Sequence, residues 1–458
     1  MEVQFLFRPL YGDFGRVARD PVWEDLPAGI DADLRQAAER RLERMRTVWT
    51  DLFAVPGDAV RRSADPEDWT ENAIQLISAI ETGLPVHVVD RNHNASTQLS
   101  IARSFASVSS NDRPDAATTF DPARPTILRG TILRQDPLFP GPLLAAGDPP
   151  PVNLAWPREG KLHQGEAYWR SDVLREALGR RHVLTSGDQY GANGFQEGCL
   201  ELARQGCREI MAKIVFQAKY QAPVLVPLDL AALVAHGQAS KDQCSEDQRS
   251  GDDLDRIVFK AFYEAFDVNL MDCEERPECF LLQERITMES EYRIVVVGGR
   301  PVAGAGCVEY LSPPFHEPEH ALQGSLLRRP VGSGAFDVKV EGVRNDRQVR
   351  RDPELVSLFV EKAAELCDLL AEEESRSGEP NPFFSCVMDF AWDPDRQQVV
   401  LVETNPPDNF GLYAMDVAPV TAAIVDLAKG RAPGFDPVAD MLEGNQVNTD
   451  VPADAPEP

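Results

Sequence analysis

Two carboxylates and one amide lie near each other in the C-terminal part of the sequence. Asp389 belongs to a predicted strand, residues 383–392, and Glu403 and Asn405 end the next predicted strand, residues 398–405. An Asp-Pro-Asp turn joins the two strands. In a hairpin of suitable register, the three side chains converge at one strand end. Because carboxylate and amide oxygens are hard ligands, this set predicts a Mg²⁺ site. The alternative is that both acids simply cap exposed strand ends.

A single arginine alternates with apolar residues in another predicted strand, residues 291–297 (EYRIVVV). Arg293 shares a face of this strand with Glu291. Its guanidinium is always charged and forked, which suits a phosphoryl oxygen or a substrate carboxylate. The alternative is a structural ion pair between Arg293 and Glu291 on the sheet surface.

One lysine lies inside a third predicted strand, residues 209–216 (EIMAKIVF), and a second lysine follows it. Lys213 lies among apolar residues, and a lysine is seldom fully buried without a partner. A nucleotide phosphate would supply that partner. Lys219 follows just past the predicted strand end. The alternative is a strand lysine that extends to solvent and a second, solvated lysine in a loop.

The elements that position these residues indicate an α/β protein. In the first 185 residues, short predicted strands at 3–7, 85–89 and 125–128 alternate with an amphipathic helix at 32–52. Further strands are predicted at 279–286 and, after a Gly298-Gly299 hairpin turn, at 301–308. Amphipathic spacing predicts helices at 353–373 and 421–429.

Composition and charge restrict the class of protein. The chain has 458 residues, enough for two or three packed units. Its net charge is −28, with 74 acidic and 46 basic residues, which argues against a dedicated nucleic-acid binder. No apolar run is long enough to span a membrane and no secretory signal is present, so we expect a cytoplasmic protein. The eight cysteines show no CxxC pair and are expected to be reduced thiols.

Three motifs in order resemble the ATP-grasp superfamily, in the branch related to RimK-type ligases. They are the strand with Asp389, the Glu-x-Asn strand and glycine-containing turn VETNPPDNFGLY, and the upstream segment LLQERITMESEYRIVVVGGRPVAG. The resemblance covers residues 186 to about 430. It implies an ATP-grasp fold, in which two α+β subdomains clasp ATP, over residues 186–433. By analogy, residues 1–185 form an α/β domain of the kind that precedes it, and residues 434–458 are an acidic tail that we expect to be disordered.

The resemblance also implies a role for each candidate residue. Lys213 and Lys219 would hold the α- and β-phosphates of ATP. Gln283, Glu284 and Ile286 would line the hinge against adenine and ribose. Asp389, Glu403 and Asn405 would bind the Mg²⁺ of MgATP, and Arg293 and Lys213 would act in catalysis.

One segment departs from the pattern of the family. Many members have a glycine-rich loop after the second lysine, which covers the phosphates with backbone N–H groups. Residues 217–224 (QAKYQAPV) contain no glycine. Either the loop closes differently, or side chains provide most of the phosphate contacts.

The implied function is an ATP-dependent carboxylate–amine ligase that forms an amide or peptide bond through an acyl phosphate. ATP and Mg²⁺ would be its cofactors, and a small-molecule or peptide acid and an amine its substrates. Two alternatives stay open: a small-molecule kinase with the same fold, and a nucleotide-binding regulator without turnover. Many relatives pair up, so a homodimer is one expectation. We expect no nucleic acid and no membrane among the partners.

Overall fold

A computed structural model describes part of the 458-residue chain. The described residues are 3–7, 75–76, 78–91, 99–105, 120–121, 124–129, 171–185, 192–214, 224–228, 280–307, 335–341, 349–378, 381, 383–405, 411, 413, 415–430 and 438. Lys219 and the predicted helix at 32–52 lie outside them.

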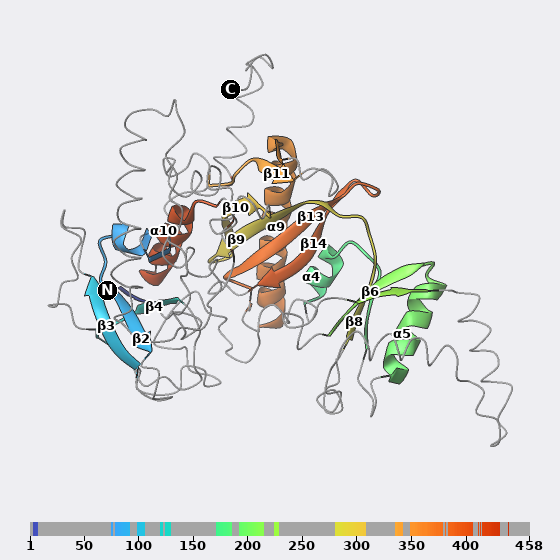
Figure 1. Cartoon of the computed structure of the whole chain (residues 1–458), viewed down its shortest axis with the longest axis horizontal. Helices are drawn as coiled ribbons and strands as arrows, with labels where there is room; N and C mark the ends of the chain where they lie inside the picture. Colours follow the sequence, from blue (N-terminus) through green and yellow to red (C-terminus); the bar gives the residue numbers. More distant parts are fainter. Residues whose placement is uncertain are drawn as a thin grey trace, which may run out of the picture. The chain divides into compact units, whose positions relative to one another are not determined.

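The chain is a mixed α/β protein, as the sequence predicts (Figure 1). It divides into two compact units. Unit 1 comprises Met1–Leu174, Glu289–Trp392 and Leu401–Pro458. Unit 2 comprises Arg175–Met288 and Asp393–Val400. Each unit is described below by itself.

The N-terminal sheet of unit 1 has the strand order β3-β2-β1-β4. Its strands are β1 (Gln4–Phe7), β2 (Val86–Arg91), β3 (Leu99–Phe105) and β4 (Thr126–Arg129). β1 is parallel to β2 and β4, whereas β3 is antiparallel to β2. All four residues of β1 are buried, which is typical of a parallel strand covered on both faces.

The sheet that carries the candidate carboxylates lies mainly in unit 1, with the end of β13 and the start of β14 counted in unit 2, and has the order β10-β9-β13-β14. Its strands are β9 (Glu289–Val297), β10 (Arg300–Gly306), β13 (Cys386–Asp393) and β14 (Gln398–Asn405). Gly298 and Gly299 form the β9–β10 turn with φ of 65° and 74°, values that glycine adopts without strain. β13 is antiparallel to β9 and places Asp389 directly opposite Arg293.

The described part of unit 1 also contains two longer helices and a short strand pair. They are α9 (Pro353–Ser377), α10 (Val417–Ala428), β11 (Lys339–Glu341) and β12 (Val349–Arg351). α9 begins after Asp352, whose carboxylate accepts a hydrogen bond from the N–H of Leu355 at 3.0 Å, and Gly378 ends it in the left-handed conformation. α9 packs on β9 and β10, where Phe359 stacks on Tyr292 with ring centroids 5.4 Å apart. α10 contacts the same two strands and also β4.

Unit 2 is a four-stranded antiparallel sheet with a helix on one face. Its elements are α4 (Asp172–Ala177), which begins in unit 1, β5 (His182–Thr185), α5 (Ala192–Arg204), β6 (Glu209–Ile214), β7 (Val224–Pro227) and β8 (Phe280–Glu284). The strand order is β5-β8-β6-β7. The outer strands thus leave β8 and β6 in the middle of the sheet.

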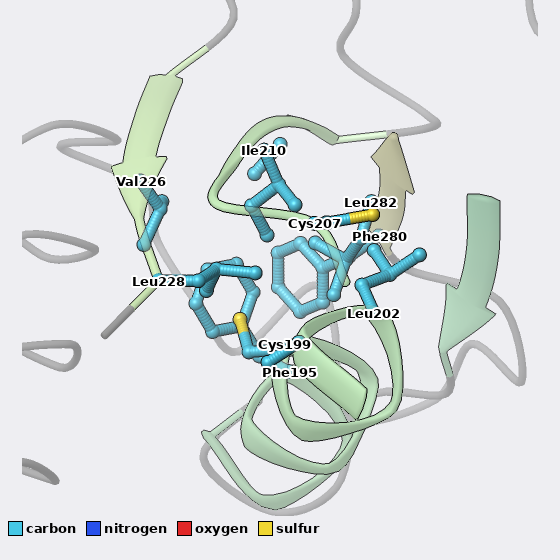
Figure 2. Packing of buried hydrophobic residues seen from close by; sticks show 11 residues of the cluster. Phe195, Cys199, Leu202, Cys207, Ile210, Val226, Leu228, Phe280 and Leu282 are labelled. Carbon is cyan, nitrogen blue, oxygen red and sulfur yellow. The ribbon is translucent and has the colours of Figure 1, made fainter. Parts of the chain in front are cut away.

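The core of unit 2 lies between α5 and this sheet. Phe195, Cys199 and Leu202 recur at helical spacing, so they face the sheet together. Figure 2 shows them gathered with Phe280 and Leu282, which are alternate residues of β8. The rings of Phe195 and Phe280 meet edge to face, with centroids 5.7 Å apart.

Most of the predicted C-terminal elements are confirmed, with shifts of a few residues at their ends. The predicted strand at 209–216 is β6, that at 279–286 is β8, that at 291–297 lies within β9, and the predicted helices at 353–373 and 421–429 correspond to α9 and α10. Ile286 lies beyond the end of β8. Within the described ranges, no helix is long and apolar enough to cross a membrane.

The cysteines of the described part are all free thiols, as predicted. They are Cys199, Cys207, Cys307, Cys367 and Cys386. Four of them are buried, and Cys307 is partly buried. Burial raises the pKa of Cys199 and Cys367 to about 12, so both stay protonated in the folded protein.

Candidate functional site

The predicted cluster of two carboxylates and one amide is present in unit 1. Asp389 lies on β13 and is 1% exposed. Asn405, at the end of β14, donates from Nδ2 to Asp389 Oδ2 and to Glu403 Oε1, each at 3.0 Å. One amide nitrogen therefore bridges two carboxylates, and the three predicted metal ligands lie together.

Arg293 is the charged partner of this cluster. Its Nε donates to Asp389 Oδ1 at 2.7 Å and its Nη2 donates to Asp389 Oδ2 at 2.8 Å. The two residues face each other on β9 and β13, so the forked ion pair follows from the strand register. Asp389 on the neighbouring strand, rather than Glu291 on the same strand, therefore accepts hydrogen bonds from two of the three guanidinium nitrogens of Arg293.

The third guanidinium nitrogen of Arg293 binds Gly411, which follows β14 in the sequence. Nη1 donates to the carbonyl oxygen of Gly411 at 3.1 Å. The guanidinium carbon also lies 5.0 Å from the centroid of the Tyr413 ring, within cation–π range. Tyr413 has φ of 48°, a left-handed conformation that a non-glycine residue seldom adopts. Backbone strain of this kind often marks functional sites.

Arg293 keeps its positive charge in this site, whereas the neighbouring Tyr413 and Cys307 stay neutral. Burial lowers the pKa of the Arg293 guanidinium, but the charge and hydrogen bonds of Asp389 outweigh burial and raise the pKa above its ordinary value. Burial raises the pKa of the Tyr413 hydroxyl and of the Cys307 thiol. The charges of Glu291 and Asp389 raise that of Cys307 further. Cys307 therefore remains a thiol at neutral pH and is no candidate nucleophile.

Two candidate residues of unit 2, Lys213 and Gln283, lie on the sheet face that points away from α5. Lys213 lies on β6 opposite Leu281, and Gln283 lies on β8 opposite His182 and Met211. Because side chains alternate along a strand, Lys213 and Gln283 share this face. Gln283 is fully buried, and neither Oε1 nor Nε2 of its amide has a hydrogen-bond partner among the described residues. Such an amide costs free energy unless something pairs with it.

Glu284 is committed to a contact within unit 2. Its Oε2 lies 3.0 Å from Nη2 of Arg396 and accepts a hydrogen bond from the backbone N–H of Arg181 at 3.3 Å. Arg396 also pairs with the fully buried Asp393 at 3.0 Å. Glu284 thus helps to hold the turn between β13 and β14, and a ribose hydroxyl would have to reach its other oxygen. Ile286 is partly buried.

The oxygen donors in unit 1 fit Mg²⁺ in chemical type. Asp389 and Glu403 supply two carboxylates, the number that Mg²⁺ commonly takes from a protein. Among the described residues, no three His, Cys, Asp or Glu side chains are placed to hold a metal, so the third ligand has to be an amide or come from a substrate. As oriented here, Asn405 turns its donor nitrogen toward both carboxylates. The amide has to rotate before Oδ1 can serve as a ligand.

Two residues of this site were missed by reasoning from the sequence. Gly411 and Tyr413 both contact Arg293, yet neither was a candidate. The available signal was the glycine-containing turn that follows the Glu-x-Asn strand. It indicated a turn at this position but not which strand the turn would meet.

Comparison with known proteins finds structural likeness at low sequence identity. No protein-family model and no curated protein matches the sequence. D-alanyl-alanine synthetase A from Vibrio cholerae is 11% identical over 98% of this chain and 99% of its own, with a TM-score of 0.34. Phosphoribosylamine–glycine ligase from Thermotoga maritima is 10% identical over 81% and 75%, with a TM-score of 0.39. An ATP-grasp RimK domain protein from Sphaerobacter thermophilus is 13% identical over 82% and 94%, with a TM-score of 0.31. TM-scores of this size transfer neither fold nor activity, so the function has to be argued from the residues.

Proposed function

We propose that this protein is an ATP-dependent carboxylate–amine ligase of the ATP-grasp type. The observation that carries the proposal is the cluster in which Asn405 joins Asp389 to Glu403 while Arg293 holds Asp389. Two carboxylates beside a permanent positive charge suit a divalent cation and a transferring phosphoryl group. The order of motifs along the chain, from Gln283 and Glu284 to Glu403 and Asn405, agrees with this reading.

In the proposed reaction the substrate carboxylate attacks the γ-phosphorus of ATP, which gives an acyl phosphate and ADP. An amine then attacks the acyl carbon, and phosphate leaves as the amide bond forms. Asp389 and Glu403 would hold Mg²⁺, which neutralises phosphoryl charge when bound. Arg293 supplies a fixed charge to the oxygens of the acyl phosphate. Catalysis by such groups consists of positioning and charge stabilisation, and it needs no side-chain nucleophile.

The nucleotide is proposed to bind through the residues of unit 2. The buried amide of Gln283 finds no hydrogen-bond partner in the described part of the chain, and the edge of adenine offers a donor beside an acceptor that would satisfy it. Lys213 shares that face of the sheet and would hold a phosphate together with Lys219. Glu284 and Ile286 would complete the hinge. The same proposal places the enzyme in the cytoplasm with a small-molecule or peptide acid and an amine as substrates.

ADP release tests this proposal. The protein is incubated with Mg²⁺ and ATP against pooled amino acids and small carboxylates, as wild type, as Glu403→Gln, and as Glu372→Gln. Glu372 is exposed on α9, so its variant is the matched control. A ligase shows turnover that needs both an acid and an amine and that is lost only in Glu403→Gln. Turnover with an acceptor alone identifies the kinase, and MgATP binding without turnover favours the regulator. Absence of MgATP binding contradicts all three.

A further inference from the structure

The carboxylate of Asp389 is almost saturated with hydrogen bonds. It accepts from Nε and Nη2 of Arg293 and from Nδ2 of Asn405. A carboxylate offers about four lone-pair positions, so three of them are occupied. Only 1% of Asp389 is exposed, which leaves water little part in satisfying it. Hydrogen-bond donors of the protein therefore stabilise the negative charge of Asp389, as a bound cation would otherwise do.

These donors also oppose a cation that arrives alone. Asp389 and Glu403 carry two negative charges, and Arg293 cancels one of them. A divalent ion on Asp389 would lie close to the guanidinium, and like charges a few ångströms apart repel strongly in a buried setting. The N–H groups of Asn405 would face the ion as well. The cluster as it stands favours its internal partners over a free ion.

Arg293 has contacts that do not depend on Asp389. Its Nη1 donates to the carbonyl oxygen of Gly411, and its guanidinium carbon lies 5.0 Å from the centroid of the Tyr413 ring. These two contacts can keep the guanidinium in place while Nε and Nη2 change partner. An anionic oxygen close by would be the natural new acceptor.

Resting on the proposed function, we propose that Arg293 exchanges partners when the site is loaded. Without ligand it neutralises Asp389. When a divalent cation takes Asp389 and Glu403, Nε and Nη2 of Arg293 lose Asp389 as acceptor and donate instead to an anionic phosphoryl oxygen, and Asn405 rotates its amide so that Oδ1 faces the cation. The cation and the anion consequently bind cooperatively, because each removes the penalty that Arg293 imposes on the other.

Binding of Mn²⁺, followed by the electron paramagnetic resonance signal of the free ion, tests the exchange without turnover. The full-length wild type is titrated with Mn²⁺ alone and with a non-hydrolysable ATP analogue, and analogue affinity is measured with and without Mn²⁺. We expect weak binding of Mn²⁺ alone and coupling of about tenfold or more between ion and analogue. Arg293→Gln should bind Mn²⁺ alone more tightly than wild type and lose most of the coupling. Arg376→Gln, an exposed change at the end of α9, should behave as wild type.

A second variant keeps the test decisive if Arg293→Gln does not fold. Asn405→Asp replaces the donor amide with a third carboxylate, so Mn²⁺ alone should bind more tightly without rotation of a side chain. If Arg293→Gln binds Mn²⁺ alone more weakly than wild type, or if the coupling between ion and analogue persists in this variant, the exchange of partners is wrong. Arg293 then stays paired with Asp389 and has a structural role. If Arg293→Gln does not fold, Asn405→Asp binding of Mn²⁺ alone no tighter than wild type overturns it too. An analogue that binds wild type in these cases leaves the ATP-dependent function standing. Failure of wild type to bind the analogue under any condition removes that function and the exchange with it.

Discussion

At the scale of single residues, the pair between Arg293 and Asp389 is the most consequential contact in the described site. Both side chains are largely buried, and Asp389 has few other ways to satisfy its charge. Breaking a buried pair costs more than its net contribution, because an uncompensated charge remains. The chemistry of the site and the stability of its sheet therefore depend on the same two side chains.

Asp389→Asn should destabilise the protein by about 3–5 kcal/mol, because Arg293 would stay buried without its counter-charge. Urea denaturation measures this. Glu403→Gln is the matched comparison, since it removes a carboxylate charge that accepts from Asn405 but leaves Arg293 paired with Asp389, and it should cost about 1 kcal/mol. Equal losses for the two variants would show that the buried ion pair is not what holds β9 to β13.

A histidine of the N-terminal sheet predicts a pH dependence of stability. His87, on β2, is fully buried against Phe120, and burial followed by the charge of Arg124 lowers its pKa to about 4. The unfolded chain, with a pKa near 6.5, binds the proton more readily than the folded one. Stability from this group is thus complete above pH 6.5 and falls as the pH drops toward 4.

Between pH 7.5 and pH 5, His87 should account for a loss of about 2 kcal/mol in the free energy of unfolding. Urea denaturation of wild type and His87→Gln at both pH values measures the contribution of His87 to the free energy of unfolding. The variant should lose less stability than wild type over the same range. If wild type and His87→Gln showed the same pH dependence of stability, His87 would not be the residue responsible for it.

At the scale of elements, the hairpin of β13 and β14 could be predicted from the sequence, because its turn residues and apolar alternation are local. The same holds for α9, which has Asp352 and Pro353 at its start and Gly378 at its end. The convergence of Asp389, Glu403 and Asn405 followed from that hairpin.

Other parts of the site depend on contacts between segments distant in sequence. The pairing of β9 with β13 joins Arg293 to a residue 96 positions away. The return of the chain that brings Tyr413 onto Arg293 is equally non-local. Nor does any pattern reveal that Gln283 is unpaired or which way the amide of Asn405 points, since both depend on neighbours across the fold.

Close packing of β10 against β11 gives a prediction at this scale. A Cβ atom at Gly306 would lie 2.5 Å from the backbone carbonyl oxygen of Lys339, which cannot move without shifting the strand. Gly306→Ala should therefore cost about 1–3 kcal/mol in unfolding experiments. Lys339→Ala, which keeps that carbonyl and removes only the side chain, should have a much smaller effect. A neutral Gly306→Ala would mean that the two strands are not in close contact.

At the scale of the whole molecule, the net charge of −28 is a source of self-repulsion. Salt screens this repulsion over about 8–10 Å at moderate ionic strength. Moving from low salt to about 0.15 M should raise Tm by about 1 °C, which corresponds to about 1 kcal/mol for a chain of this size. Thermal unfolding measures the shift. At a pH near the isoelectric point the shift should vanish, and a persistent one would point to specific ion binding.

The buried thiols make each unit report on its own opening. Cys199 and Cys207 belong to unit 2, and Cys367 and Cys386 to unit 1. While folded, they are shielded and their pKa values are raised, so a thiol reagent reacts with them chiefly when the surrounding structure opens. Mass spectrometry of the modified peptides would then measure the rate at which each unit opens, within one sample. Similar labelling rates for all four thiols would mean that the two units open together in one cooperative step. Two distinct rates, one for each unit, would mean that the units open independently.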